Sequence, residues 1–177
     1  MRFAAQPAAA AGRSEQMILF RIGQQVFALS ASSVQEIRSA DAFSGLSAQA
    51  ADPSLRKVSF VARRGRPPLY IVHGGLHFGL SLPQGSLVFL LRNRRSALRV
   101  DSIERMAAFS RLMALPSAFC GDERNWYRGF VALDDGIVPV VNPDGLLRQD
   151  ELELLDALTS VAPPAPEHLL EESLGTL

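Results

Sequence analysis

The sequence predicts an all-β protein made of two small five-stranded barrels related by an internal repeat, followed by a C-terminal helix. Three observations predict this architecture: a series of short apolar runs separated by turn residues, a match between the two halves of the chain at a constant offset, and one amphipathic stretch near the end. The 177 residues are 47% hydrophobic and 20% charged, which is a globular composition.

The apolar runs are each four to six residues long and are bounded by Gly, Pro, Asn, Asp or arginine-rich turns. This pattern is typical of the strands of a sandwich or barrel. In the first run, Ile18, Phe20 and Ile22 alternate with other residues and therefore share one face of a strand. The expected strands are Met17–Ile22, Val26–Ser30, Val34–Arg38, Lys57–Ala62, Leu69–Val72, Leu87–Leu91, Ala97–Val100, Ile103–Ala108, Arg128–Leu133 and Ile137–Val141.

The repeat appears when the sequence is shifted by 69 positions, the spacing between Phe20 and Phe89. Five runs then coincide without a gap, and we expect the two phenylalanines in equivalent core positions. A unit of about 60 residues has a small core, and closing its sheet removes exposed edges. The predicted organisation is a flexible arm (1–16), a first barrel (17–82), a second barrel (86–147), and an acidic helix and tail (149–177).

The helix is predicted over Asp144–Leu158, where leucines recur between acidic residues, and Pro163 and Pro164 end it. We expect it to dock on the second barrel through Leu154, Leu155 and Leu158. The formal net charge is zero, but no Lys or Arg follows Arg148 and seven acidic residues do. The remaining 18 basic and 11 acidic residues give the body a charge of +7.

Few groups in the sequence suggest catalysis or metal binding. His73 and His77 are four residues apart, but glycines separate them and no third ligand is near, so a metal site is disfavoured. Cys120 has no histidine within forty residues, and Asp134 with Asp135 and Gly136 is typical of a hairpin turn. We therefore expect a non-enzymatic protein without metal or cofactor. No apolar run has the roughly 18 residues of a membrane span, which favours a cytoplasmic protein.

Four motifs, in this order, resemble the chemotaxis coupling (CheW-like) domain family over residues 17–148. The first joins an opening hairpin to a Val-x-Glu-Ile strand, and the second is an arginine-glycine turn followed by a strand and a Phe-Gly element. The third is a Leu-x-Val-Asp strand pair, and the fourth is a closing hairpin. They are found at Phe20–Arg38, Ala62–Leu80, Ala97–Glu104 and Tyr127–Leu147.

The resemblance implies two SH3-like barrels in a divergent member of the family. It also implies an adaptor that couples the cytoplasmic tips of chemoreceptors to the regulatory domain of a sensor histidine kinase. Glu36 and Arg64 match residues that the family uses at or near its receptor contact, although they are equally well explained as an ordinary cross-strand ion pair. The resemblance places partner-binding residues at Val34, Glu36, Ile37, Arg38, Arg64, Val100, Asp101 and Gly129.

A second hypothesis is a small barrel that binds nucleic acid. Arg63, Arg64 and Arg66 form one cluster and Arg92, Arg94 and Arg95 another, and clustered guanidiniums can contact phosphates. Solvated hairpin turns are the favoured interpretation of both clusters, because each lies between apolar runs next to turn residues, and the acidic tail would compete with phosphates. The adaptor is therefore the preferred interpretation.

Overall fold

The computed structural model describes residues 14–44, 46–49, 52–80, 85–134 and 136–161. Every predicted strand is present, and its ends lie within three residues of the apolar run that predicted it. The strands are β1 (Glu15–Ile22), β2 (Gln25–Ser30), β3 (Val34–Ser39), β4 (Ser47–Gln49), β5 (Val58–Arg63), β6 (Arg66–His73), β7 (Leu87–Leu91), β8 (Ser96–Val100), β9 (Ser102–Phe109), β10 (Tyr127–Leu133) and β11 (Gly136–Val141). The helices are α1 (Gly74–His77), α2 (Glu123–Trp126) and α3 (Gln149–Val161).

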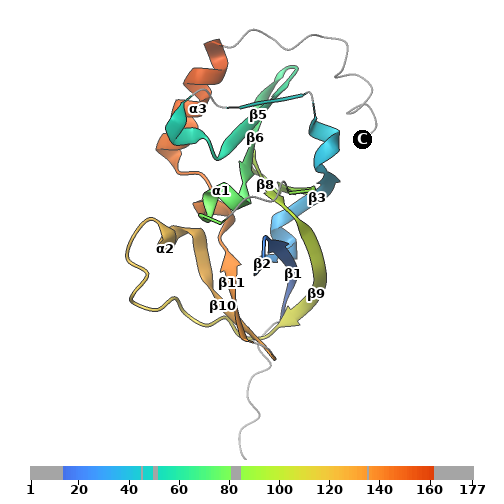
Figure 1. The fold of residues 1–177 in the computed structure, drawn as a ribbon, viewed down its shortest axis with the longest axis vertical. Helices are drawn as coiled ribbons and strands as arrows, with labels where there is room; N and C mark the ends of the chain where they lie inside the picture. The colour runs from blue at the N-terminus through green and yellow to red at the C-terminus, as the bar shows by residue number, and fades with distance from the viewer. Residues whose placement is uncertain (1–13, 45, 50–51, 81–84, 135, 162–177) are drawn as a thin grey trace, which may run out of the picture.

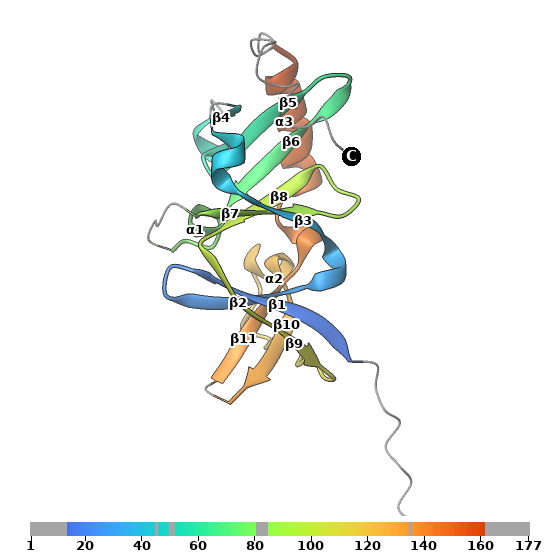
Figure 2. The same cartoon turned by 90° about the vertical axis from the view of Figure 1, so that its right-hand side faces the viewer.

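The strands form two sheets, which lie one above the other in Figures 1 and 2. Sheet I has five strands in the order β10-β11-β2-β1-β9, and sheet II has six in the order β3-β7-β8-β6-β5-β4. The sixth strand, β4, is not among the ten strands predicted from the sequence. Among the described residues, β10 does not pair with β9 in sheet I, and β3 does not pair with β4 in sheet II. These four strands are therefore the edges of their sheets.

The internal repeat is visible in the topology. The offset of 69 residues relates β1, β2, β3, β5 and β6 to β7, β8, β9, β10 and β11, and it converts the order of sheet I into that of sheet II without β4. The registers agree as well. Val140 lies opposite Ala28 in the parallel ladder between β11 and β2, and Ile71 lies opposite Ala97 in the parallel ladder between β6 and β8.

The expected barrel boundaries require a correction, because each half of the chain gives its first hairpin to the other sheet. The hairpin β1–β2 belongs to sheet I with β9 to β11, and β7–β8 belongs to sheet II with β3 to β6. Residues 17–82 and 86–147 are therefore not separate sheets. The exchange joins the halves, and residues of both sheets form one large core cluster that neither half could form alone.

Phe20 of β1 and Phe89 of β7 lie at the centre of this shared core. Both side chains are fully buried, and their rings meet edge to face with 5.3 Å between centroids. Edge-to-face packing is a favoured geometry for aromatic pairs. The expectation that the two phenylalanines are equivalent core residues is confirmed.

Helix α3 begins later than predicted, because Pro143–Gly145 form a separate 3-10 turn. It covers one face of sheet II beside β5 and β6 (Figure 2). Asp156 accepts two hydrogen bonds of 2.8 Å from Arg95 and one from the hydroxyl of Tyr70. Of the three leucines expected to dock, only Leu155 is buried, whereas Leu154 and Leu158 are exposed. The helix thus packs on sheet II through Leu155 and the partly buried Leu152, and through polar contacts that include the Asp156 anchor and the ion pair of Glu151 with Lys57.

The expected N-terminal arm is shorter than 1–16, because Glu15 and Gln16 pair with Phe109 and Ala108 as the first residues of β1. Residues 1–13 and the tail 162–177 lie outside the described residues. Within the described part of the chain, none of the helices has the length and apolar character needed to cross a membrane.

Candidate protein-binding groove

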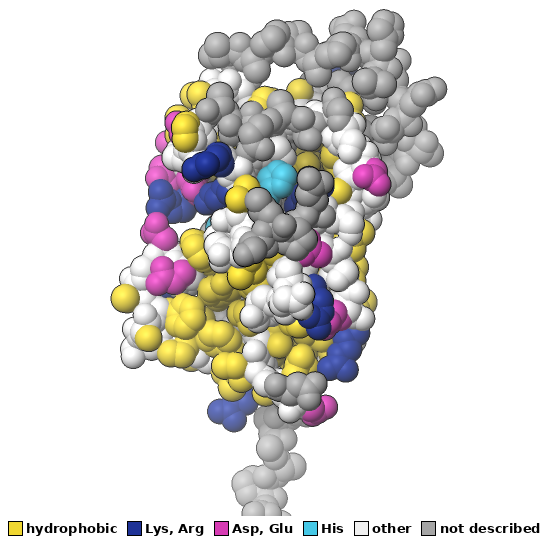
Figure 3. Space-filling model, in the orientation of Figure 1, with side chains coloured by type: hydrophobic (Ala, Val, Ile, Leu, Met, Phe, Trp, Pro, Cys, Tyr) yellow, Lys and Arg dark blue, Asp and Glu magenta, His cyan; other side chains and the backbone are white. Residues whose placement is uncertain are grey.

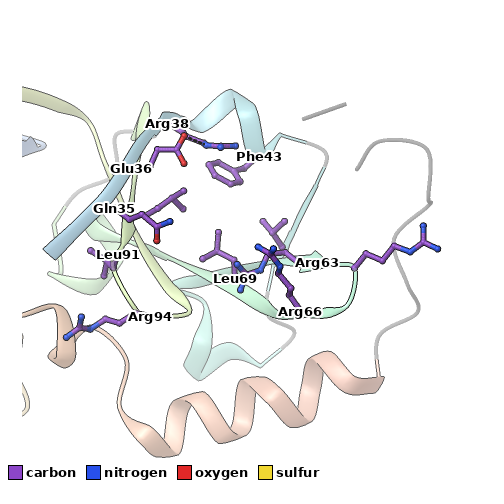
Figure 4. A pocket seen from close by; sticks show the side chains of 12 residues that line it. Gln35, Glu36, Arg38, Phe43, Arg63, Arg66, Leu69, Leu91 and Arg94 are labelled. Carbon is purple, nitrogen blue, oxygen red and sulfur yellow. Dashed lines mark hydrogen bonds and ion pairs between the residues drawn. The ribbon is translucent and has the colours of Figure 1, made fainter. Parts of the chain in front are cut away.

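An open groove of about 420 Å³ lies on the face of sheet II away from α3 (Figure 4). Its floor is apolar: Val61 and Leu69 lie opposite each other on β5 and β6, and Phe43 closes one end. All three are at least nine-tenths buried, in a cluster that also includes Ile71 and Val88. The residues that line the groove are Gln35, Glu36, Arg38, Phe43, Val61, Arg63, Arg64, Arg66, Leu69, Leu90, Leu91 and Arg94.

The edge strand β3 forms one wall of the groove. Its pairing with β7 places Glu36 opposite Leu90 and Arg38 opposite Val88. Because side chains alternate along a strand, Glu36 and Arg38 face the groove and Ile37 faces away, where its side chain is exposed. Arg38 donates to the Glu36 carboxylate at 2.7 Å. The alternative ion pair between Glu36 and Arg64 is therefore not the one observed, since Arg38 on the same strand takes the carboxylate.

The opposite wall is rich in arginine because of a parallel ladder. β6 and β8 run parallel with Tyr70 opposite Ser96, so the turns that precede them lie at the same end of sheet II. These turns carry the two arginine clusters of the sequence, and the groove includes Arg63, Arg64 and Arg66 from one and Arg94 from the other. The sequence identified both clusters but could not show that they meet.

The arginines differ in how they are neutralised. Arg94 pairs with Asp144, and Arg63 donates to the backbone oxygen of Pro67 at 2.9 Å. Burial lowers the pKa of Arg63, and the charges of Arg66 and Arg95 lower it further. The side chains of Arg64 and Arg66 are exposed, and neither side chain makes a hydrogen bond or an ion pair within the residues that the structure describes. The groove therefore combines an apolar floor with unneutralised positive charge.

Four of the residues expected to bind a partner have structural positions outside the groove. The side chains of Val34 and Val100 are buried in the shared core. Asp101 accepts a hydrogen bond of 2.6 Å from the backbone of Gly23 and so holds the β1–β2 turn. Gly129 has a φ of 153°, and a Cβ there would lie 2.3 Å from the Met113 carbonyl oxygen, so the residue provides close backbone contact.

Sheet I presents a different surface at its edge strand β9. Ile103 and Met106 have 38% and 60% of their side chains exposed, and both lie on β9. Figure 3 shows a separate gathering of hydrophobic side chains over the lower half of the face, mainly on the side of α2 and β10. We refer to Ile103 and Met106 as the apolar edge. The apolar edge could not be predicted from the sequence, because apolar residues in a strand are equally typical of a core position.

The two histidines have different surroundings. Nδ1 and Nε2 of His77 are buried without a hydrogen-bond partner, and its ring packs between Phe78 and Trp126. Burial lowers the pKa of His77 to about 3. Nε2 of His73 instead lies 3.1 Å from the hydroxyl of Ser59. Among the described residues, no group of three potential metal ligands is present.

The other candidate groups have simple positions. Cys120 is exposed in the segment between β9 and α2. Asp134 follows β10, whose antiparallel pairing with β11 confirms the predicted hairpin.

Comparison with known proteins supports the fold. The sequence matches no protein-family model and no curated protein. The structure is similar to that of the scaffolding protein TtCheW from Thermoanaerobacter tengcongensis, with a TM-score of 0.62 and 12% sequence identity. The similarity covers 78% of this chain and 96% of TtCheW. The chain therefore has a CheW-like fold, as the sequence motifs predicted.

Proposed function

We propose that this protein is a non-catalytic adaptor that couples a chemoreceptor to a sensor histidine kinase in the cytoplasm. The observation that supports it most is the groove of sheet II on a CheW-like fold. Glu36 and Arg64, which the sequence resemblance places near the receptor contact, line this groove from opposite walls. A groove with an apolar floor and charged walls suits a helix that presents apolar side chains flanked by acidic ones.

An adaptor needs a second surface that is free when the first is filled. The apolar edge on β9 meets this requirement because it belongs to sheet I, whereas the groove belongs to sheet II. Exposed apolar side chains on an edge strand favour binding to another protein, through side-chain burial or by strand addition. We assign the receptor tip to the groove and the kinase regulatory domain to the apolar edge.

Nucleic-acid binding is a second candidate, and the observation in its favour is that both arginine clusters contribute to one groove. Against it, Glu36 lies on the groove wall, and the aromatic ring in the groove, Phe43, is buried. Single-stranded nucleic acids bind basic grooves largely by stacking bases on accessible aromatic rings. The groove therefore fits an acidic protein segment better.

The test is a binding measurement between the full chain and a purified cytoplasmic receptor fragment. We expect Arg64→Glu to weaken binding at least about tenfold, because it places a negative charge on the groove wall. The matched control is Arg111→Glu, an exposed arginine outside the groove. Equal effects of the two variants would contradict the assignment. Retention of nucleic acid that is lost at high salt, without receptor binding, would favour the second candidate.

A further inference from the structure

The groove of sheet II carries more positive charge than its own acidic groups neutralise. Its lining includes five arginines and one glutamate, and the glutamate is paired with Arg38. Arg64 and Arg66 remain exposed, without an acidic partner among the described residues. The floor of the groove, which Val61, Leu69 and Phe43 form, is apolar. A segment that fills this groove must therefore offer apolar side chains and carboxylates close together.

The chain contains one such segment near its C-terminus. Residues 167–177 have the sequence EHLLEESLGTL, with three glutamates, four leucines and no Lys or Arg. The glutamates are Glu167, Glu171 and Glu172, and the leucines are Leu169, Leu170, Leu174 and Leu177. The glutamates of this segment thus complement the arginines on the wall of the groove, and its leucines complement the apolar floor.

The connection is short enough to keep the segment near the groove. The end of α3 and the turn between β5 and β6 lie at the same end of the molecule in Figures 1 and 2. Thr159 of α3 lies 3.3 Å from the hydroxyl of Tyr70, on the face of sheet II opposite to the groove, and the neighbouring residue Leu69 lines the groove, so the connection has to pass around the β5–β6 end of the sheet. Five residues separate Val161 from Glu167. Fully extended, they span about 17 Å.

We propose that the acidic C-terminal segment 167–177 occupies the groove of sheet II within its own chain and competes with any partner that binds there. A short tether holds such a segment at an effective concentration on the order of mM, so a weak contact is enough for substantial occupancy. The competition with a receptor rests on the proposed function, whereas the occupancy of the groove does not.

The occupancy is tested by paramagnetic relaxation in the full chain. A nitroxide is attached at position 173 in the variant Ser173→Cys with Cys120→Ser, which leaves one cysteine in the chain. We expect amide signals of Arg64, Leu69 and Leu90 to broaden. The broadening should disappear in Arg64→Glu with Arg66→Glu. It should return when Glu171→Lys and Glu172→Lys are added, because the charges are then exchanged. The matched control is Glu153→Lys on α3, which should leave the broadening unchanged.

Three results would overturn the proposal. The first is unchanged broadening in the groove variant, and the second is no broadening in the starting protein. The third is broadening only when spin-labelled and isotope-labelled molecules are mixed, which would mean that a second copy supplies the segment. A receptor fragment then tests the competition. If the segment fills nine-tenths of the grooves, Glu171→Lys with Glu172→Lys should raise receptor affinity about tenfold. Unchanged affinity overturns competition, and a receptor that fails to bind any variant overturns the proposed function but not the occupancy.

Discussion

β3 and β9 are related by the internal repeat and hold the same place at the edges of their sheets, yet they differ in chemistry. On β3, Glu36 and Arg38 form an ion pair on the wall of a charged groove. On β9, Arg105 and Ala107 take the places of Glu36 and Arg38, whereas Met106 and its equivalent on β3, Ile37, are both exposed apolar residues. The comparison shows that duplication preserved the strand order while the two exposed edges diverged. The proposed adaptor function assigns a different partner to each of the two edges.

The largest expected effect tests whether the two halves are equivalent in the core. Phe20→Ala and Phe89→Ala should each lower the free energy of unfolding by about 3–5 kcal/mol, because each removes a fully buried aromatic ring from the shared core. Urea denaturation of the two variants measures the cost. A loss of less than about 1 kcal/mol in the free energy of unfolding for either variant would contradict the equivalence of the two phenylalanines.

A second difference between the repeats lies just after β6 and β11, where His77 in one copy corresponds to buried Leu146 in the other. The pKa of His77 is lowered to about 3, so the unfolded chain takes up a proton at this position before the folded chain does. Stability should therefore fall as the pH decreases from the ordinary histidine pKa, about 6.5, toward 3. Between pH 7.5 and 5 the loss from His77 is about 2 kcal/mol.

The substitution His77→Leu copies the other repeat and should remove this loss. Urea denaturation at pH 7.5 and pH 5 measures it, and His73→Gln is measured alongside, because burial also lowers the pKa of His73 and its share of the pH dependence has to be separated from that of His77. If His77→Leu leaves the difference between the two pH values unchanged, the buried neutral histidine is not its cause.

The difference between the two edges is tested with one variant at each surface, since each variant should weaken the binding of one partner and not of the other. Met106→Glu should weaken binding of the kinase regulatory domain by at least about tenfold, equivalent to ~1.4 kcal/mol, and leave receptor binding unchanged. Arg64→Glu should do the reverse. Leu154→Glu, on an exposed part of α3, is the control for inserting a carboxylate at an apolar surface position. Calorimetry with each partner separates the outcomes, and a variant that weakens both equally would argue against two surfaces.

The smallest expected effect concerns α3, which covers sheet II and has no counterpart on sheet I. Hydrogen bonds from Arg95, and to a lesser extent from Tyr70, lower the pKa of Asp156. The stability from this anchor is present above the ordinary carboxylate pKa and is lost as the pH falls through the lower folded value. Because the ion pair is partly exposed, Asp156→Asn should cost no more than about 1 kcal/mol at pH 7. A larger cost in urea denaturation would mean that α3 contributes more to the fold of sheet II than this anchor accounts for.

The strands and the repeat could be predicted from the sequence because alternation and turn residues are local signals. The exchange of hairpins could not, because a contiguous and an exchanged arrangement show the same offset of 69 residues. Only the ladders of β2 with β11 and of β6 with β8 distinguish them, and these are parallel contacts between distant strands.

The same limit applies to the groove. Glu36 and Arg64 were identified by resemblance, but Val61 and Leu69 carried no signal beyond that of strand residues. The parallel ladder that brings Arg94 to the same end of the sheet as Arg66 is a tertiary feature. Val100, Asp101 and Gly129 were placed with the binding residues because their motif is recognisable, and the structure shows that burial, a turn contact and close backbone packing give them structural positions.

The most direct test of the adaptor is the capture of a histidine kinase on an immobilised receptor fragment, with and without this protein. We expect the kinase to be retained only when the full chain is present. Arg64→Glu should abolish retention of both the adaptor and the kinase, whereas Met106→Glu should keep the adaptor and lose the kinase. Equal retention of the kinase in the absence of the protein, or loss of the adaptor from the receptor in Met106→Glu, would contradict coupling through two separate surfaces.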